Sequence, residues 1–370
     1  MAKAPTRLSG LHDRYGRWLA AHPDAADDFS EAIAELLSDA GIAFDAVTAR
    51  VKTWRSLRAK ARLRTPGGAW RYPDPWADIH DLVGVRITTY HSHEIPDVLA
   101  VLGDSLDVLR TTDKTAETRV AGQLGYGSHH LVCRVGEGAP EGLAAYRGQH
   151  FEIQVRTVLQ HAWAEFEHDI RYKSPEGPVD PRIDRAFSLA AGLIELADQQ
   201  FDQIAAILDD AEDADLAEAA APGAGAAGAG EGAGDAGASD ADAVRLGADT
   251  LPGLLTLLLP GTPRSKSEQY PWLEELLEAN GVTTVGGLRE LVDGERVAAV
   301  ERALKYRFQP GHIRIVDDLL LSVHGQDHVD RTGRTGAHPR VRPDRLKGRL
   351  AQLRKAGIAP PAAETRAPAG

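Results

Sequence analysis

Apolar and polar positions alternate between two periods over the first two hundred residues, which predicts strands interleaved with helices. Short β-branched or apolar runs predict strands over 83–87, 131–135 and 151–155. Apolar spacing of three and four predicts helices over 95–102, 158–170 and 183–208, with one or two amphipathic helices in the first 45 residues. This interleaving favours a sheet domain of the α/β or α+β class.

The second half of the chain has a different pattern. Between Asp209 and Asp242 the sequence is nearly all Ala, Gly and acid, with ten Asp or Glu and no Lys or Arg. Such a segment cannot bury a core and predicts a flexible acidic linker. Short helices are predicted after it, over 251–259, 272–277, 288–292, 297–306 and 313–323.

From residue 330 the chain is rich in Arg, Gly and Pro, and nine Lys or Arg stand against one Asp between Arg331 and Lys355. A solvated basic helix in a mobile tail is favoured over a nucleic-acid-binding arm. The predicted parts are N-terminal helices (1–45), a sheet domain (46–210), a linker (211–249), a small all-α unit (250–329) and a basic tail (330–370).

Charge and cysteine content exclude several classes of protein. The formal net charge of -12 argues against a protein that coats nucleic acid or anionic membranes with its whole surface, so an anion site requires a local cluster of cations. The single cysteine, Cys133, excludes an intrachain disulfide and a cysteine-based zinc cage. No apolar run is long enough for a signal peptide or a membrane span, which predicts a soluble, cytoplasmic protein.

The first candidate cluster is a local island of cations. Arg50 and Lys52 share one side of an extended segment, while Ser56 and Lys60 share one face of a helix that begins near Trp54. These four groups could converge on a polyphosphate. A solvated basic face is the alternative interpretation.

The second cluster begins a strand. Asp81 suits Mg²⁺, which takes one or two protein carboxylates and completes its octahedron with phosphate oxygens and water. Arg86 can bind phosphate or stack on a purine ring. A capping aspartate and a surface ion pair are equally compatible with the local sequence.

Two further segments place polar side chains on strand faces. Tyr126, Ser128 and His130 share one face after a glycine-flanked turn, where the tyrosine ring could stack on a base or be purely structural. Glu152 and Gln154 share the face opposite an apolar one, and such a polar face is costly unless it lines a site or pairs internally. Glu152 could accept a hydroxyl proton or help to hold the metal.

The order of these motifs resembles the synthetase domain of the RelA/SpoT family, especially its small stand-alone members, over roughly residues 44–211. The motifs are Arg-x-Lys-x-x-x-Ser-x-x-x-Lys from Arg50, Asp-x-x-Gly-x-Arg from Asp81, Gly-Tyr-x-Ser-x-His from Gly125 and Glu-Ile-Gln-x-Arg-Thr from Glu152. The resemblance implies an α+β fold with a nucleotidyltransferase-like mixed sheet. It also implies transfer of pyrophosphate from ATP to the 3′-hydroxyl of GDP or GTP, with Mg²⁺ as cofactor.

The resemblance also implies a role for each matching residue. Asp81 and Glu152 would hold the metal, and Glu152 would also activate the 3′-hydroxyl. The implied ATP site comprises Arg50, Lys52, Ser56, Lys60 and Arg86. The implied acceptor site comprises Tyr126, Ser128, His130, Arg119, Lys114 and Gln154.

The acceptor side departs from the family pattern, because Gly122 stands where a lysine is usual; Lys114 or Arg119 could compensate. Relatives that modify the 3′ end of tRNA or an adenine nucleotide therefore stay open as alternatives, as does a catalytically silent nucleotide sensor. Self-association, known for some small relatives, is compatible with the sequence. A hydrolase domain is not expected.

Overall fold

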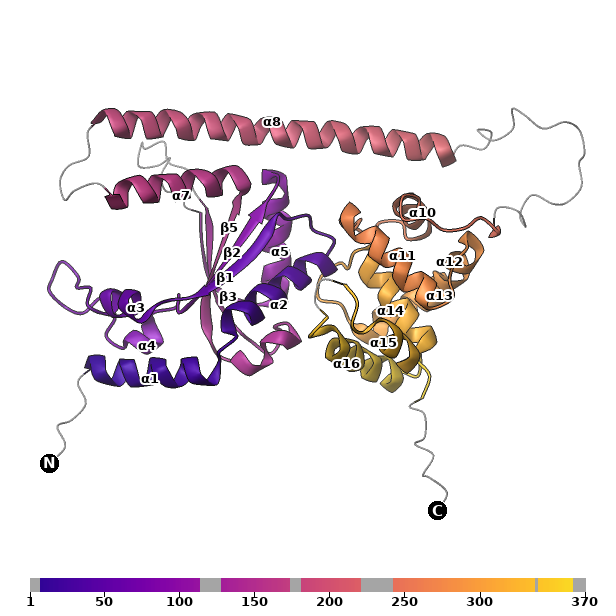
Figure 1. The fold of residues 1–370 in the computed structure, drawn as a ribbon, viewed down its shortest axis with the longest axis horizontal. Helices are drawn as coiled ribbons and strands as arrows, with labels where there is room; N and C mark the ends of the chain where they lie inside the picture. The colour runs from indigo at the N-terminus through magenta and orange to yellow at the C-terminus, as the bar shows by residue number, and fades with distance from the viewer. Residues whose placement is uncertain (1–6, 114–127, 174–180, 221–241, 337–338, 362–370) are drawn as a thin grey trace, which may run out of the picture. The chain divides into compact units, whose positions relative to one another are not determined.

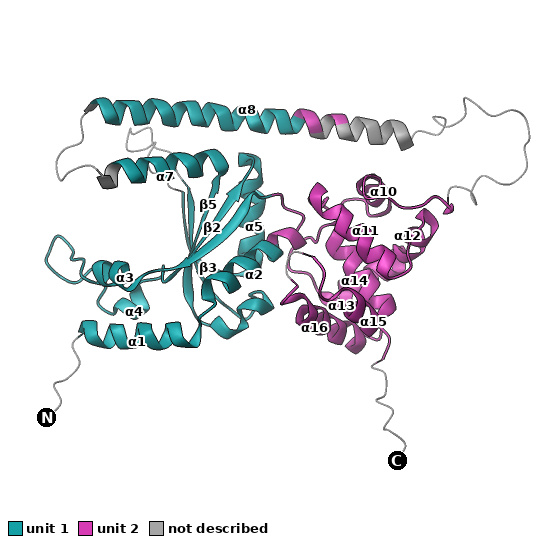
Figure 2. Ribbon diagram, in the orientation of Figure 1, with its two compact units in different colours: residues 1–36, 44–206 teal, residues 37–43, 207–370 magenta. Residues whose placement is uncertain are grey.

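The computed structural model describes residues 7–113, 128–173, 181–220, 242–336 and 339–361 (Figure 1). The chain divides into two compact units: residues 1–36 with 44–206, and residues 37–43 with 207–370 (Figure 2). The predicted α+β class is confirmed, since a mixed sheet with flanking helices is followed by helices alone.

The first unit is built on a sheet of five strands in the order β1-β2-β5-β4-β3. The strands are β1 (Ala46–Val51), β2 (Val83–Thr89), β3 (Asp107–Asp113), β4 (His129–Arg134) and β5 (His150–Thr157). The pair β2 and β5 is parallel and the other pairs are antiparallel. Sequence patterning predicted β2, β4 and β5 but missed β3, where the register shifts between Val108 and Arg110 and the apolar alternation is broken.

One face of the sheet carries the core of this unit. Phe151, Ile153 and Val155 on β5 are fully buried. The ring of Phe29 on α2 (Ala25–Asp39) lies 4.8 Å from that of Phe151, and α5 (Ile95–Ser105) buries Leu102. Helices α2 and α5 thus contribute to the buried layer, and the alternation along β5 leaves Glu152 and Gln154 on the opposite face.

A second cluster positions the helix that follows β1. Side chains of α1 (Arg7–Ala21) pack against α3 (Trp54–Ala61) and the segment after α4 (Pro75–Asp78). The buried members are Leu11, Tyr15, Leu57, Ala61, Ile79 and Leu82. Thr53 caps α3 by accepting a hydrogen bond from the Ser56 amide, so the start of α3 is fixed beside the end of β1. Two 3₁₀ turns, η1 (Ser92–Glu94) and η2 (Glu141–Tyr146), complete this unit's connections.

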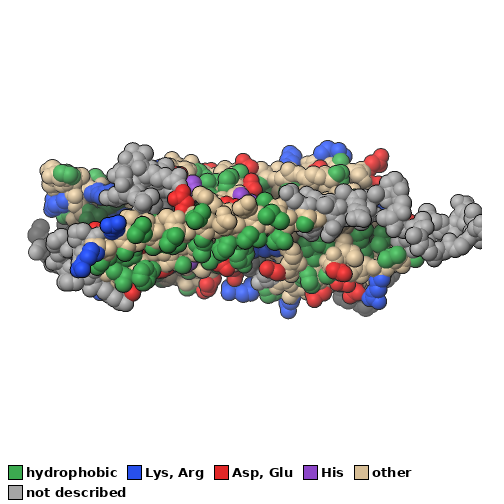
Figure 3. All heavy atoms as spheres, turned by 90° about the horizontal axis from the view of Figure 1, so that it is seen from above, with side chains coloured by type: hydrophobic (Ala, Val, Ile, Leu, Met, Phe, Trp, Pro, Cys, Tyr) green, Lys and Arg blue, Asp and Glu red, His purple; other side chains and the backbone are tan. Residues whose placement is uncertain are grey.

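Two helices follow the last strand. Helix α7 (Val158–Lys173) packs Trp163 against Phe187 of α8 (Pro181–Ala220). On α8, Asp198 accepts a hydrogen bond from the Thr157 hydroxyl. Figure 3 looks onto the outer side of α8 and shows hydrophobic side chains along it. Several large apolar residues of α8 are more than half exposed, among them Leu189, Leu193, Leu196 and Ile204.

Helix α8 corrects the predicted start of the linker. Residues 211–220, predicted to be flexible, continue the helix, because alanine and glutamate are strong helix formers even where no core is buried. At the other end of the predicted linker, Leu246 is buried in the core of the helical unit. Residues 221–241 lie outside the described residues.

The second unit is helical. Its elements are α10 (Leu251–Leu258), η3 (Ser267–Gln269), α11 (Tyr270–Ala279), α12 (Val285–Leu291), α13 (Gly294–Leu304), α14 (His312–His324), α15 (Gln326–Thr332) and α16 (Arg342–Lys355). The five predicted helices correspond to α10 to α14. No helix among the described residues is long and apolar enough to cross a membrane.

The prediction of a solvated basic tail is wrong for residues 342–355. Helix α16 buries Leu346, Leu350 and Leu353 almost completely in the helical core. Their spacing of four and three places them on one face, so the apolar stripe was present in the sequence but was masked by the surrounding arginines and lysines.

Candidate functional site

The polar face of the sheet carries two rows of paired residues that cross all five strands. Cross-strand partners point to the same face of a sheet and lie about 5 Å apart. The first row consists of Arg50, Gly84, Glu152, Val132 and Arg110. The second row consists of Thr48, Arg86, Gln154, His130 and Thr112.

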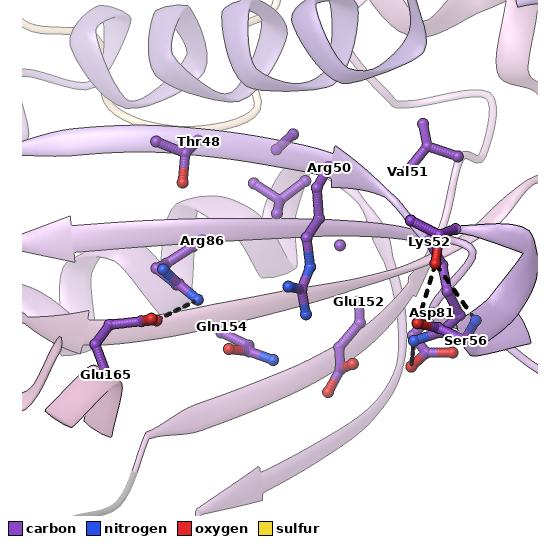
Figure 4. Close-up of a pocket in the computed structure, with 14 residues that line it drawn as sticks. Thr48, Arg50, Val51, Lys52, Ser56, Asp81, Arg86, Glu152, Gln154 and Glu165 are labelled. Atoms are coloured by element: carbon purple, nitrogen blue, oxygen red, sulfur yellow. Dashed lines mark hydrogen bonds and ion pairs between the residues drawn. The ribbon is translucent and has the colours of Figure 1, made fainter. Parts of the chain in front are cut away.

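A cavity of about 310 Å³ lies over the β1, β2 and β5 side of these rows. Figure 4 shows Arg50, Arg86 and Glu152 directed toward it, with Lys52 and Asp81 at one end. Its lining includes most of the residues predicted for the ATP site and the metal: Arg50, Lys52, Ser56, Asp81, Arg86 and Glu152. Gln154, which was predicted for the acceptor site, lines the same cavity. Gly84 contributes open space, because a Cβ built there meets nothing within 4 Å.

Asp81 lies between two lysines. Its Oδ2 accepts from Lys60 Nζ at 2.8 Å and from Lys52 Nζ at 3.0 Å. Burial alone would raise the pKa of Asp81, but these hydrogen bonds and the two positive charges hold the pKa below its ordinary value. Oδ1 is buried and has no hydrogen-bond partner among the described residues, so the carboxylate is ionised and half satisfied.

Glu152 is joined to a histidine and a serine. His130 Nδ1 lies 2.6 Å from Glu152 Oε1, and His130 Nε2 lies 2.7 Å from Ser128 Oγ. One neutral tautomer satisfies both contacts, with Nδ1 donating to the carboxylate and Nε2 accepting from the hydroxyl. The pairing of β4 with β5 thus brings three predicted residues together and fixes the orientation of the Glu152 carboxylate.

At the far end of the cavity Arg86 contacts two residues of α7 for which no site role was predicted. Arg86 Nη2 lies 3.0 Å from Glu165 Oε1 on α7, and Arg86 Nη1 lies 3.4 Å from His161 Nε2. Burial and the charge of Arg86 lower the pKa of His161. The spacing of His161 and Glu165, one helical turn apart directly after the Gln154 strand, is the signal that could have identified them.

Four other predicted residues do not line this cavity: one lines a second cavity, and three lie outside the described residues. Lys60 lines a second cavity, of about 300 Å³, and does not line the first. It donates a hydrogen bond to Asp81, which lines both cavities. Tyr126, Lys114 and Arg119 lie outside the described residues, so the predicted base-stacking tyrosine and the compensating cations stay predictions.

The carboxylates can be tested against the Mg²⁺ that the sequence predicts. No group of three or more His, Cys, Asp or Glu side chains in the described part of the chain could enclose a metal ion. Mg²⁺, however, needs only one or two protein carboxylates when phosphate oxygens and water complete its shell. The unpartnered Oδ1 of Asp81 and the nearby Glu152 fit that donor set.

Residues 49–177 match the model of the region found in RelA / SpoT proteins. This segment contains the end of β1, the strands β2 to β5 and all the lining residues of the cavity except Thr48. The resemblance inferred from the four motifs is therefore confirmed over these residues, which carry a RelA/SpoT region. No curated protein matches the chain.

Solved structures that match part of this chain include small alarmone synthetase 1 of Bacillus subtilis bound to its product pppGpp. It is 23% identical, with 53% of this chain and 99% of that chain covered and a TM-score of 0.41. The same B. subtilis protein bound to AMPCPP is 20% identical, with 54% and 99% covered and a TM-score of 0.40. A GTP pyrophosphokinase family protein from Streptococcus pneumoniae is 20% identical, with 54% and 96% covered and a TM-score of 0.44.

Proposed function

We propose that this protein transfers the pyrophosphate group of ATP to the 3′-hydroxyl of a guanine nucleotide, giving AMP and a 3′-pyrophosphorylated product of the alarmone type. The observation that carries the proposal is the cavity on the polar face of the sheet. It combines two carboxylates with at least three cations inside a region that matches RelA/SpoT proteins.

The donor would lie over β1 and β2. Arg50 and Arg86 project from adjacent strands, in neighbouring rows of the same face, and can take the adenine ring between their guanidinium planes. Lys52 and Ser56 can hold the triphosphate beside the start of α3, where the helix dipole favours an anion.

The acceptor's 3′-oxygen would attack the β-phosphorus of ATP while the bond from that phosphorus to the α,β-bridging oxygen breaks and AMP leaves. Glu152 would accept the hydroxyl proton, and its contact with His130 Nδ1 keeps the carboxylate oriented. Asp81 and Glu152 would hold Mg²⁺, which supplies charge neutralisation for the phosphates when bound. Positioning and electrostatics account for most of the rate in transfers of this kind.

One incubation tests the proposal. Purified protein is given γ-labelled ATP and Mg²⁺ with GDP, GTP, ATP or tRNA as acceptor, and the products are separated. We expect AMP and a labelled guanine nucleotide. Label only in tRNA or in an adenine nucleotide would replace the acceptor assignment, and absence of AMP with every acceptor would contradict the proposal and favour a nucleotide sensor.

A further inference from the structure

An excess of positive charge follows the start of β1. Between Asp45 and Asp74 the sequence contains eight Lys or Arg and no Asp or Glu. Lys52 and Lys60 pair with Asp81, whereas the other six are arginines that have no ion-pair partner among the described residues. In a chain of net charge -12, a local cluster of unpaired arginines indicates an anionic partner.

Helix α3 presents three of these arginines on a face of their own. Arg55, Arg58 and Arg62 are exposed, and their spacing of three and four residues places them on one face of the helix. Leu57 and Ala61 are buried on another face, in the cluster that joins α3 to α1. None of the three arginines lines either cavity. They can therefore bind a partner other than the two nucleotides of the proposed reaction.

The hairpin of residues 63–71, directly after α3, adds an aromatic ring that contacts two guanidinium groups. Arg64 pairs with Trp70 across an antiparallel bridge, and its guanidinium carbon lies 3.7 Å from the centre of the Trp70 ring. The guanidinium carbon of Arg7 lies 4.5 Å from the same centre. Trp70 nevertheless stays 38% exposed. Aromatic rings and guanidinium planes are the groups on which proteins stack unpaired bases.

Arg7 joins the hairpin to α3. It donates to the backbone oxygen of Ala61, at the end of α3, at 3.1 Å, and to that of Pro73, beyond the hairpin, at 3.2 Å. In Figure 1, α1, α3, α4 and the loop after α3 gather at one end of the first unit. The exposed face of α3 and the Trp70 contacts therefore belong to one surface. This arginine surface consists of Arg7, Arg55, Arg58, Arg62, Arg64 and Trp70.

We propose that the arginine surface binds single-stranded nucleic acid, with phosphates on the three arginines of α3 and an unpaired base stacked at Trp70. Arginine suits both contacts, because its planar group can hold a phosphate or stack on a base. This inference does not depend on the proposed function.

Two other polyanions fit the surface less well. A duplex would satisfy the arginines, but its bases are paired and stacked on one another and cannot use Trp70. An acidic protein segment, such as residues 209–242 of this chain, would also satisfy the arginines but contains no aromatic ring to stack there. The combination of charge with an exposed indole ring therefore favours a single strand.

The test measures the fluorescence anisotropy of a labelled RNA strand of about 16 nucleotides with the full-length protein at several salt concentrations. The variant Arg55→Ala/Arg58→Ala/Arg62→Ala should raise Kd about 10- to 100-fold. The slope of log affinity against log salt should become shallower by about 2, because each phosphate contact on a single strand contributes about 0.7. A DNA strand of the same sequence is measured in parallel, and the tighter binder of the two identifies the ligand.

Arg134→Ala/Arg147→Ala/Arg185→Ala is the matched control. These three arginines are exposed, lie outside the arginine surface and change the net charge equally. The Kd and the salt slope of this control should equal those of wild type. Equal weakening in the two triple variants would mean that only net charge matters and would overturn the proposal.

Trp70→Ala separates stacking from charge. We expect the Kd for the single strand to rise about 5- to 100-fold, since base stacking on an aromatic ring is lost, with an unchanged salt slope. Trp70→Phe should recover part of the loss because a ring is kept. A thermal melt of each variant verifies the fold, and the triple variant of α3 tests the surface even if Trp70→Ala unfolds.

Competition supplies the remaining outcomes. Wild type should bind the single strand more tightly than a duplex of the same length, and a peptide of residues 209–242 should not displace the strand at equal charge concentration. Equal affinity for duplex and single strand, displacement by the peptide, or no binding near physiological salt would each contradict the proposed ligand.

Discussion

The polar face of the sheet and the interior of the helical unit both contain clusters of aspartate with cations, and they differ in how completely the charges are satisfied. In the helical unit, Asp317 accepts from both terminal nitrogens of Arg342, at 2.6 and 3.0 Å, from Arg349 at 3.1 Å and from His328 at 2.9 Å. Asp318 beside it accepts from Arg349, Arg314 and Tyr306 at 2.6 to 2.7 Å.

The carboxylate oxygens of Asp317 and Asp318 therefore all have partners. On the sheet, Asp81 uses one oxygen and leaves the other without a partner among the described residues. The side chains of Asp317 and Asp318 are 4% and 0% exposed, whereas those of Asp81 and Lys60 are 16% and 31% exposed. A buried aspartate pair whose carboxylate oxygens all have partners is costly to disrupt, whereas a carboxylate oxygen without a partner beside a cavity can receive a ligand. The difference separates a structural cluster from a candidate site although the residue types are the same.

Removing the carboxylates of the sheet should have the largest effect on activity. Asp81→Ala and Glu152→Ala should each lower the rate of AMP formation from ATP and GDP by about 10³-fold or more, because preorganised charge supplies most of the catalysis. The midpoint of thermal unfolding should change little, since these groups face an open cavity.

Steady-state turnover and a thermal melt of the same preparations check this prediction. Asp104→Ala, an exposed aspartate on α5, is the control and should match wild type in both. Near wild-type activity in both site variants would show that the carboxylates are not part of a reaction centre.

In the helical cluster, removing an aspartate should instead lower the stability of the unit. Asp317→Ala leaves Arg342, Arg349 and His328 without their buried acceptor and should cost about 3 to 5 kcal/mol in the free energy of unfolding of the helical unit. Denaturant titration followed by circular dichroism measures the loss.

Asp344→Ala is the control for that experiment. Asp344 lies on α16, and its 82% exposed side chain pairs only with Lys347, at 3.2 Å, among the described residues, so the change should be within about 0.5 kcal/mol. Equal stability of the two variants would remove the distinction between saturated and open clusters.

Filling the first cavity with a larger side chain should weaken ATP binding, by less than the loss expected from removing the carboxylates. In Gly84→Val the new side chain would project from the second position of the first polar row toward the cavity, and its Cβ would meet nothing within 4 Å. We expect KM for ATP to rise about 10- to 100-fold, a loss of 1.4 to 2.7 kcal/mol in binding free energy, with unfolding unaffected.

Gly103→Ala on α5 provides the comparison, since its Cβ also meets nothing within 4 Å but lies outside the cavity. It should leave KM for ATP unchanged. An unaltered KM in Gly84→Val would show that ATP does not lie over this strand.

The smallest expected effect is a dependence of stability on pH in the helical unit. Burial, aided by the charge of Arg264, lowers the pKa of His312 from 6.5 to about 4. The folded state therefore resists protonation that the unfolded chain accepts, and stability that is present above pH 6.5 is lost as the pH falls toward 4.

Between pH 7 and pH 5.5 the free energy of unfolding of the helical unit should fall by about 1 kcal/mol. Denaturation of wild type and His312→Gln at both pH values measures it. The variant should show a smaller decrease between the two pH values, and an equal decrease would mean that another group causes the pH dependence.

The sequence by itself determined the elements whose signals are local. Alternation along residues 151–155 was sufficient to assign Phe151 and Ile153 to the core and Glu152 and Gln154 to a polar face, and short motifs indicated half of the residues that line the first cavity. These signals survive in a single segment because strand and helix periods depend only on neighbouring residues.

Tertiary structure decided what depends on pairing between distant segments. Arg110 lies in the same row as Glu152 only because β3 pairs with β4 and β4 with β5, a register that no local pattern specifies. Likewise, α16 can bury Arg342 and place Arg349 at the core because both pair with Asp317, 25 and 32 residues earlier in the chain. A charged side chain can be buried only when it is paired with an opposite charge, and the tertiary fold determines which residue is that partner.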